Sequence, residues 1–258
     1  MSDTAMDFAR HGWHEHPPRV LLDFPAGDLG HDCTAALPPA SEPSIRALFA
    51  TQAVERFAPP RAIFWEGDAA IDVFYLLEGC VRVHRTLQDG RRAILGFIRA
   101  GGLLGVSFQD SYLFTAEAIT PARLRRLPRR RFLTLVDESS NLRPKLHAEI
   151  CSETTAAQDQ IICLGRTGAD QRVANFLLKL PRHSCSDPGS PEEIEIPFGR
   201  LDIADYLGLT VETVSREISK LKRKGVIATS GPHKIRLLRL RSLREIARIG
   251  ARPQVGAA

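Results

Sequence analysis

Apolar positions in residues 199–225 recur at the spacing of two short helices joined by a tight turn. The first helix is expected over 201–207, and its apolar face consists of Ile203, Ala204 and Leu207. Gly208 follows, and a glycine adopts the backbone angles of a sharp corner without steric cost. Thr210 is placed to cap the second helix, because its hydroxyl can accept a hydrogen bond from a backbone N–H one turn later. This pattern predicts a helix-turn-helix.

The second helix is expected to carry two sets of side chains on opposite faces. The buried set recurs at spacings of three and four and consists of Val211, Val214, Ile218 and Leu221. The outward set has the same kind of spacing and consists of Glu212, Ser215, Arg216 and Ser219. A carboxylate, a hydroxyl and a guanidinium are groups that read base edges in the DNA major groove. A polar helix face is most often only solvated, but the glycine corner, the cap and these residue types together favour DNA binding.

Basic residues follow this helix and are expected to meet phosphates. The side chains assigned to the DNA backbone are Thr210, Ser219, Lys220, Lys222, Arg223 and Lys224. The formal net charge of the chain is +5, and its distribution supports this assignment. Residues 166–258 hold 17 Lys and Arg against 10 Asp and Glu, whereas residues 1–165 hold 18 against 20. The basic excess therefore accompanies the helix-turn-helix, as a nucleic-acid contact surface requires.

The segment LDIADYLGLTVETVSREISKLKRKG resembles the DNA-binding segment of the Crp–Fnr bacterial transcription regulators. Its stretch GLTVETVSR is similar to the Fnr and FixK branches, which carry Glu, Ser and Arg at these three places. The resemblance implies that Glu212, Ser215 and Arg216 read bases in a palindrome of the type TTGAT-N4-ATCAA. The cyclic-AMP receptor branch tends to have an Arg-Glu pair at the helix start, where this chain has Val211-Glu212. The resemblance extends over about 57–240.

Residues 59–130 read as short strands separated by turns. The expected strand segments are 62–65, 73–77, 80–85 and 93–98. The turns between them are rich in Gly and Asp, and Asp89-Gly90 is a dipeptide favoured in two-residue hairpin turns. This alternation predicts a small antiparallel barrel or jelly roll. The resemblance implies a cyclic-nucleotide-binding-type β-barrel, which we place at 45–136.

A long helix is expected over 137–165, beginning at Asp137 or Ser139, with Pro144 in its opening turns or at its true start. Part of it repeats imperfectly at heptad spacing, and these positions are Ile150, Thr154, Ala157, Ile161 and Leu164. Such a seam is consistent with a contact between two helices in a homodimer. A helix that packs on its own barrel is the alternative. A palindromic target favours the dimer, because a twofold DNA site mirrors a twofold protein.

The remaining C-terminal part, 166–250, is expected to be a winged helix-turn-helix domain, entered through a hinge at Gly165 and Gly168. A helix over 170–180, a loop over 183–193, a β-wing over 226–237 and a last helix over 242–249 complete it. The overall class is therefore α+β, with a jelly-roll barrel, a long dimerisation helix and this DNA-binding domain.

Both termini lack sustained periodicity. Residues 1–44 are expected to form a poorly ordered arm, and 251–258 a frayed tail. The arm contains His11, His14, His16, His31 and Cys33, which we interpret as incidental rather than as metal ligands. We expect no secretory signal, and we expect a cytoplasmic location without membrane contact.

The barrel lacks the residues that known effectors of the family require. Cyclic-nucleotide members hold the phosphate with a Glu shortly after a Gly and with an Arg before Ser-Ala, and this chain has Phe114 where that Arg would be. Fnr members hold an iron–sulfur cluster with four thiolates, but only Cys33 lies near the N-terminus. We therefore expect no cofactor, no metal and no cyclic nucleotide. Absence of both sets resembles FixK-type members, which regulate microaerobic, nitrogen-fixation or denitrification genes.

The sequence also suggests two further residue roles and leaves two alternative functions open. The resemblance implies contact with RNA polymerase, for which the hairpin residues Gln88, Asp89 and Gly90 are candidates in an activator. Cys185 is a candidate redox switch, whereas the other cysteines are expected to be small buried apolar residues. One alternative is a sensor of haem, nitric oxide or redox state, with His84 as the barrel histidine. A cupin-like barrel enzyme is the distant alternative, and the chain has no phosphate loop or nucleophile elbow that would favour it.

Overall fold

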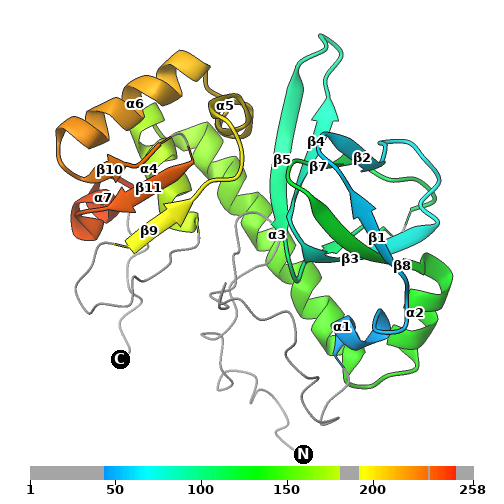
Figure 1. Ribbon diagram of the computed structural model, residues 1–258. Coiled ribbons are helices and arrows are strands. Elements are labelled where there is room, and N and C mark those ends of the chain that lie inside the picture. Colours follow the sequence, from blue (N-terminus) through cyan, green and yellow to red (C-terminus); the bar gives the residue numbers. More distant parts are fainter. Residues whose placement is uncertain (1–43, 108, 181–191, 232, 248–258) are drawn as a thin grey trace, which may run out of the picture.

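The computed structural model describes residues 44–107, 109–180, 192–231 and 233–247. A β-sandwich, a long helix and a C-terminal helical domain with a small sheet follow one another along the chain (Figure 1). The expected arm and tail, with their histidines and Cys33, lie outside these residues. So does Cys185.

The β-sandwich is a jelly roll, as the sequence predicted. In the described residues it has two antiparallel sheets of four strands each. The first sheet is ordered β1 (Val54–Phe57), β8 (Ala122–Pro128), β3 (Asp72–Glu78) and β6 (Leu103–Leu104). The second is ordered β2 (Arg61–Phe64), β7 (Thr115–Ala118), β4 (Cys80–Thr86) and β5 (Arg92–Arg99). The hairpin between β4 and β5 is a five-residue loop closed by Leu87 and Arg91, so the expected two-residue turn at Asp89-Gly90 is wrong.

The space between the two sheets is filled by apolar side chains. Phe64 stacks on Tyr112 with 3.8 Å between ring centroids, and the Phe74 ring lies 5.8 Å from that of Phe64. Phe114 is half-buried and packs against the same cluster, 5.9 Å from Phe64. Phe114 therefore contributes to the packing of the barrel interior.

The outer faces of the two sheets are covered by different parts of the chain, because alternate residues of a strand point to opposite faces. Helices α1 (Ile45–Leu48), α2 (Arg129–Asp137) and α3 (Leu142–Arg166) pack on the outer side of the first sheet, where Tyr75 and Leu103 lie. The C-terminal domain packs on the outer side of the second sheet, against Ile94 and Phe97. Helices α1 and α2 and strands β1, β6 and β7 were not predicted.

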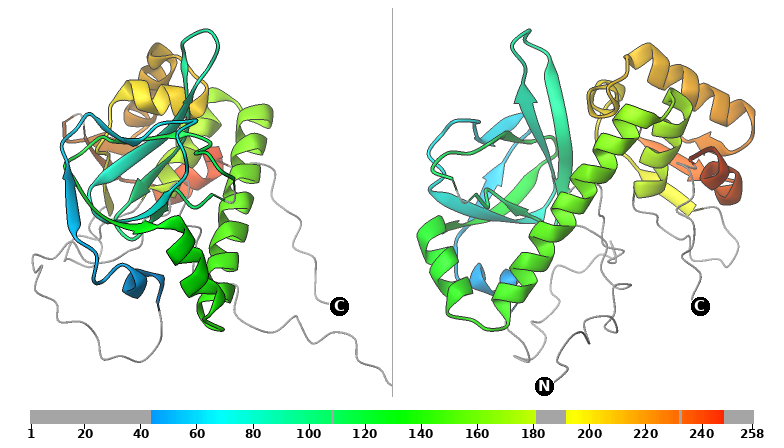
Figure 2. Two further views of the ribbon diagram at one scale, coloured as in Figure 1. Left: turned by 90° about the vertical axis from the view of Figure 1, so that its right-hand side faces the viewer. Right: turned by 180° about the vertical axis from the view of Figure 1, so that it is seen from behind.

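Helix α3 joins the two halves of the molecule, running from the α1–α2 end of the barrel to the C-terminal domain (Figure 2). It begins at Leu142 rather than at Asp137 or Ser139, because Asp137 is the last residue of α2. Pro144 is its third residue and so lies in the first turn, where a missing N–H costs nothing. Gly165 lies inside α3, and Gly168 is the N-cap residue of the next helix, which begins at Ala169.

The C-terminal domain consists of helices around a small antiparallel sheet. Its helices are α4 (Ala169–Lys179), α5 (Arg200–Leu207), α6 (Val211–Arg223) and α7 (Leu240–Ala247). In the described residues its sheet is ordered β10 (Ile227–Thr229), β11 (Lys234–Leu237) and β9 (Glu192–Glu195). Strand β9 was missed, since its alternating Glu and Ile were assigned partly to a loop. Among the described helices, none combines the length and the apolar character that crossing a membrane requires.

Candidate nucleic-acid interface

Helices α5 and α6 form the helix-turn-helix at the predicted positions. Gly208 ends α5 with φ of 59°, the left-handed conformation that favours glycine, and the N–H of Leu209 donates to the carbonyl of Ala204 at 3.0 Å. Thr210 caps α6, and its hydroxyl accepts from the N–H of Thr213 at 3.2 Å. The corner and the cap together fix the direction in which α6 leaves α5.

Apolar packing determines which face of α6 is turned outward. Val214, Ile218 and Leu221 are buried in one cluster with residues of α4, α5 and β11, and Val211 packs against this cluster while half-buried. Glu217 is also buried, at 6% exposure, although the sequence pattern did not single it out. Its carboxylate accepts from the Lys220 ammonium at 2.7 Å, three residues further along the helix.

The predicted base-reading side chains lie exposed on the opposite face, in the first turns of α6. Glu212, Ser215 and Arg216 all have this position. Hydrogen bonds from its own backbone N–H and from Thr210, with Arg216 nearby, hold the pKa of the Glu212 carboxyl below its ordinary value. Glu212 is therefore ionised at neutral pH and presents hydrogen-bond acceptors only.

The predicted backbone-contacting side chains surround this face. Lys222, Arg223 and Lys224 are exposed at the C-terminal end of α6. Ser219 is exposed too, and its hydroxyl donates to the Ser215 carbonyl at 2.8 Å. Lys220 differs from the others, because its ion pair with Glu217 occupies the ammonium that was assigned to phosphate.

The inner side of α5 faces the barrel and carries charged residues that the sequence analysis did not select. Asp202 pairs with Arg82 of β4, and Asp205 pairs with Arg92 of β5 at 3.3 Å. We call these four side chains the interdomain clamp. The paired residues lie more than a hundred positions apart in the chain, so no local sequence pattern indicated these ion pairs. One local indication of a charged contact face was available. Asp202 and Asp205 stand three residues apart, on the side of α5 away from Leu207.

His84 lies in the same interface, buried at 6% exposure on the outer face of β4. Its Nδ1 has no hydrogen-bond partner. Burial and the nearby Arg82 lower the pKa of the His84 imidazole, and Arg92, Glu117 and Glu66 are the other charged groups that act on it. The ring is thus neutral at pH 7 and buried rather than solvated.

The cysteines are only partly as expected. Cys80 and Cys163 are buried, whereas Cys151 is exposed on α3, so that part of the expectation is wrong. Burial raises the pKa of the Cys80 thiol to about 12, which keeps it protonated and unreactive. In the described part of the chain, no group of three or more His, Cys, Asp or Glu side chains is arranged to hold a metal ion.

The predicted dimer seam lies on α3, next to the face that packs on its own barrel. The buried side chains of α3 are Leu142, Leu146, Ala156 and Cys163, and the first two pack in the apolar cluster on the outer side of the first sheet. Of the seam residues, Ile150 is half-buried, and Thr154, Ala157, Ile161 and Leu164 are exposed. Ile161 is 70% exposed, which is unusual for a large apolar side chain in a folded domain.

The β4–β5 hairpin tip is exposed at Gln88, Asp89 and Gly90. The Asp89 carboxylate accepts from Arg91 at 2.7 Å, and this contact holds the pKa of Asp89 below its ordinary value. The tip and helix α6 lie at the same end of the molecule (Figure 1).

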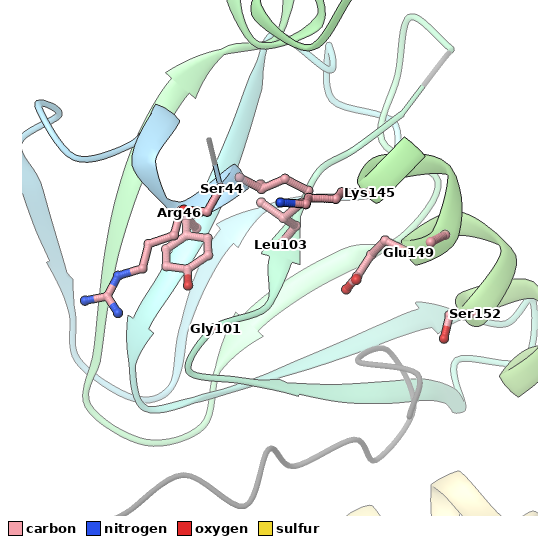
Figure 3. Close-up of a pocket in the computed structure, with 10 residues that line it drawn as sticks. Ser44, Arg46, Gly101, Leu103, Lys145, Glu149 and Ser152 are labelled. Atoms are coloured by element: carbon pink, nitrogen blue, oxygen red, sulfur yellow. The ribbon is translucent and has the colours of Figure 1, made fainter. Parts of the chain in front are cut away.

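A pocket of about 320 Å³ lies outside the sandwich, between α1, α3 and the edge of the first sheet. Lys145, Glu149 and Ser152 of α3 line one side of it, opposite Arg46 and Leu103 (Figure 3). A molecule bound there would contact neither Phe114 nor the aromatic residues of the barrel interior.

A stability prediction follows from the burial of His84. A lowered folded-state pKa means that the unfolded chain binds the proton more tightly, so stability is full above the unfolded value of 6.5 and declines as the pH falls below it. His84→Leu should remove this part of the decline in urea-unfolding free energy between pH 7 and pH 5. The exposed His147 supplies the control variant His147→Leu. An unchanged pH dependence in His84→Leu would show that His84 does not contribute.

Comparisons with known proteins agree with this geometry. Residues 54–139 match the cyclic nucleotide-binding domain family, and residues 171–246 match the Crp-like helix-turn-helix domain family. The nitrogen fixation regulation protein FixK of Bradyrhizobium diazoefficiens is 33% identical over 215 residues, covering 82% of this chain and 91% of that protein. The transcriptional activatory protein AadR of Rhodopseudomonas palustris is 37% identical over 172 residues, covering 67% of this chain and 72% of that one.

A solved structure supports the same relationship. The structure of FixK2 from Bradyrhizobium japonicum aligns with a TM-score of 0.71 at 32% identity, covering 78% of this chain and 99% of that one. These relatives are transcription regulators rather than enzymes, which removes the cupin-like alternative. The chain belongs to the Crp–Fnr family of bacterial transcription regulators, in its FixK-like branch.

Proposed function

We propose that the protein binds a palindrome of the type TTGAT-N4-ATCAA as a homodimer and activates transcription there. The observation that carries this proposal is the exposed set of Glu212, Ser215 and Arg216 on a helix whose other face is buried. These residues stand in the first turns of α6, which are the turns that reach base edges when such a helix enters the major groove.

The chemistry of these side chains supports sequence reading. The Arg216 guanidinium matches the O6 and N7 acceptors of guanine, and the ionised Glu212 carboxylate accepts from the amino group of cytosine. Lys222, Arg223 and Lys224 supply positive charge beside this surface, which favours phosphate contacts on any sequence. Lys220 is a weaker candidate for phosphate, because it is paired with Glu217.

The exposed seam on α3 supports a homodimer. Ile161 and Leu164 line a groove of about 1280 Å³ together with Leu87 and Leu95 of the β4–β5 hairpin. All four side chains are at least 37% exposed, and a partner's α3 would cover them. Two copies related by a twofold axis would present two α6 helices to the two halves of a palindrome.

The barrel supports control without a cyclic nucleotide. Apolar and aromatic side chains occupy the space between the sheets, and Phe114 offers an anionic phosphate no hydrogen-bond donor. We propose that the protein binds DNA without a bound effector, as part of FixK-like control of microaerobic, nitrogen-fixation or denitrification genes. The names of the relatives support this role, since FixK is a nitrogen fixation regulation protein and AadR is a transcriptional activatory protein.

Arg216→Ala should weaken binding to the palindrome by about 1–3 kcal/mol per half-site and relax selectivity at one position. Lys222→Ala is the control, because loss of a phosphate contact should weaken binding to all sequences alike and flatten its salt dependence. Both are measured by fluorescence anisotropy on specific and random duplexes. Equal losses on the two duplexes for Arg216→Ala would contradict a base-reading role.

Ile161→Asp should dissociate the dimer, because it places a charge without a partner in the apolar seam. Light scattering measures the mass, and anisotropy measures binding to the palindrome. Thr155→Asp adds the same charge on the exposed opposite side of α3 and should leave the mass unchanged. A dimeric Ile161→Asp variant that still binds the palindrome would place the dimer contact elsewhere.

Asp89→Ala should lower transcription from a target promoter while DNA affinity stays the same, if the hairpin tip contacts RNA polymerase. Asp89 is exposed, and among the described ion pairs it is joined only to Arg91 of the same loop, so the fold should tolerate the change. In vitro transcription with purified polymerase gives the readout. Wild-type transcription by the variant would remove the tip, including Gln88 and Gly90, from the activating surface.

A further inference from the structure

The DNA-binding domain is fixed to the barrel through a buried guanidinium. The Arg82 side chain is 8% exposed, and its two terminal nitrogens contact carboxylates from two domains. Glu117 of β7 accepts at 2.5 Å, and Asp202 of α5 accepts from the other nitrogen. Removing one partner of a buried charge is strongly unfavourable, because the remaining charge is left without compensation. The contact with Asp202 therefore resists separation of the domains.

Two further contacts surround this pair and act on the same helix. Arg92 lies 3.3 Å from the Asp205 carboxylate and 3.8 Å from that of Asp202. The Phe97 ring of β5 stacks on Phe198, just before α5, with 3.8 Å between centroids and 3° between planes. Helix α5 and the segment just before it are thus held at three points along the second sheet.

The same helix is also tied to α3 and α4. Gln160 of α3 donates to the Tyr206 carbonyl and accepts from the Tyr206 hydroxyl, both at 3.0 Å. Arg172 of α4 donates to the carbonyls of Leu164, at the end of α3, and Leu207, at the end of α5. Because Gly208 and the Thr210 cap fix α6 relative to α5, holding α5 also sets the direction of the DNA-reading helix.

We propose that the interdomain clamp of Arg82, Arg92, Asp202 and Asp205 holds α6 in its DNA-binding orientation, with the barrel acting as a fixed platform. The four residues are positioning residues for DNA recognition and contact no base. This inference rests on the proposed function, because a palindrome requires two reading helices at one separation, about one helical turn of DNA. A loosened α5 should therefore weaken binding to the palindrome and weaken its preference for the four-base spacer.

A charge swap at the more exposed pair tests this proposal. Arg92 and Asp205 are 30% and 22% exposed, so their replacement should leave the protein folded. Arg92→Glu alone and Asp205→Lys alone should each reduce affinity for the TTGAT-N4-ATCAA duplex about tenfold, and the double variant should recover most of it, as expected for a directly coupled pair. Arg91→Glu is the matched control, because it changes the same charge in the same hairpin and pairs only with Asp89 among the described ion pairs.

The same variants are measured on duplexes with three-, four- and five-base spacers. The single variants should discriminate less between spacers, and the double variant should restore the wild-type preference. A swap that fails to recover affinity, or single variants that match Arg91→Glu, would overturn the clamp. Tighter binding by the single variants would also overturn it, because the clamp would then hold a non-binding orientation.

Amide hydrogen exchange of α5 separates this inference from the proposed function. The rate of amide exchange over residues 200–207 should rise in both single variants. In the double variant it should fall back to the wild-type rate, with or without DNA. Suppose that the wild-type protein does not bind the palindrome, but that hydrogen exchange of α5 changes in the single variants and recovers in the double variant. The proposed DNA target would then be refuted, and the coupling between the barrel and α5 would still stand. Unchanged exchange, with normal palindrome binding, would refute the clamp alone. Arg92→Gln replaces Arg92→Glu if the latter does not give a native circular dichroism spectrum.

Discussion

A guanidinium buried between two domains needs carboxylates from both, and in this protein Arg82 receives them from Glu117 and Asp202. Charges at such a place are costly unless they are paired, so the pairing links the position of α5 to the second sheet of the barrel. The apolar contacts of the interface, with Phe97 stacked on Phe198, cover the same region and reduce its access to water. This contact therefore also helps to set the positions of the turn at Gly208 and of the recognition helix, because both directly follow α5 in the chain.

The barrel that provides this platform has a filled interior. Phe64, Tyr112 and Phe114 pack together in the space between the two sheets. The outer face of the second sheet, in contrast, carries buried charged and polar residues, among them Arg82 and His84. Buried polar and charged side chains thus lie on the side of the barrel that faces the DNA-binding domain, where Arg82 pairs with Asp202. The filled interior is the reason for the proposal that DNA binding needs no effector.

The sequence predicted those features that arise from local spacing. The helix-turn-helix, its glycine corner, the Thr210 cap and the outward face of α6 all depend on residues within one or two turns of each other, and the structure has them in place. The jelly roll was predicted from alternation and turn residues. Helix α2 was missed because its run of arginines, from Arg129 to Arg131, follows strand β8 without any side-chain cap to mark a helix start.

Features that depend on distant contacts were not predictable in this way. The pairing of Arg82 with Asp202 joins residues 120 positions apart, and each reads locally as an ordinary solvated charge. His84 was singled out only as the barrel histidine, and nothing in its local sequence indicated that the side chain is buried. Glu217 was passed over because a carboxylate on a buried face contradicts the apolar pattern, although Lys220 stands at the spacing that compensates it.

Binding of the purified protein to a TTGAT-N4-ATCAA duplex, in air and without added cyclic AMP, iron or reductant, tests the central claim most directly. The reference duplex has the same composition with both half-sites scrambled, at the same salt concentration, because salt alone changes affinity. The affinity for the palindrome should be at least about a thousandfold higher than the affinity for the scrambled duplex, as is usual for specific regulators. Equal affinity for the two duplexes, or specific binding only after cyclic AMP or an iron–sulfur cluster is supplied, would contradict it.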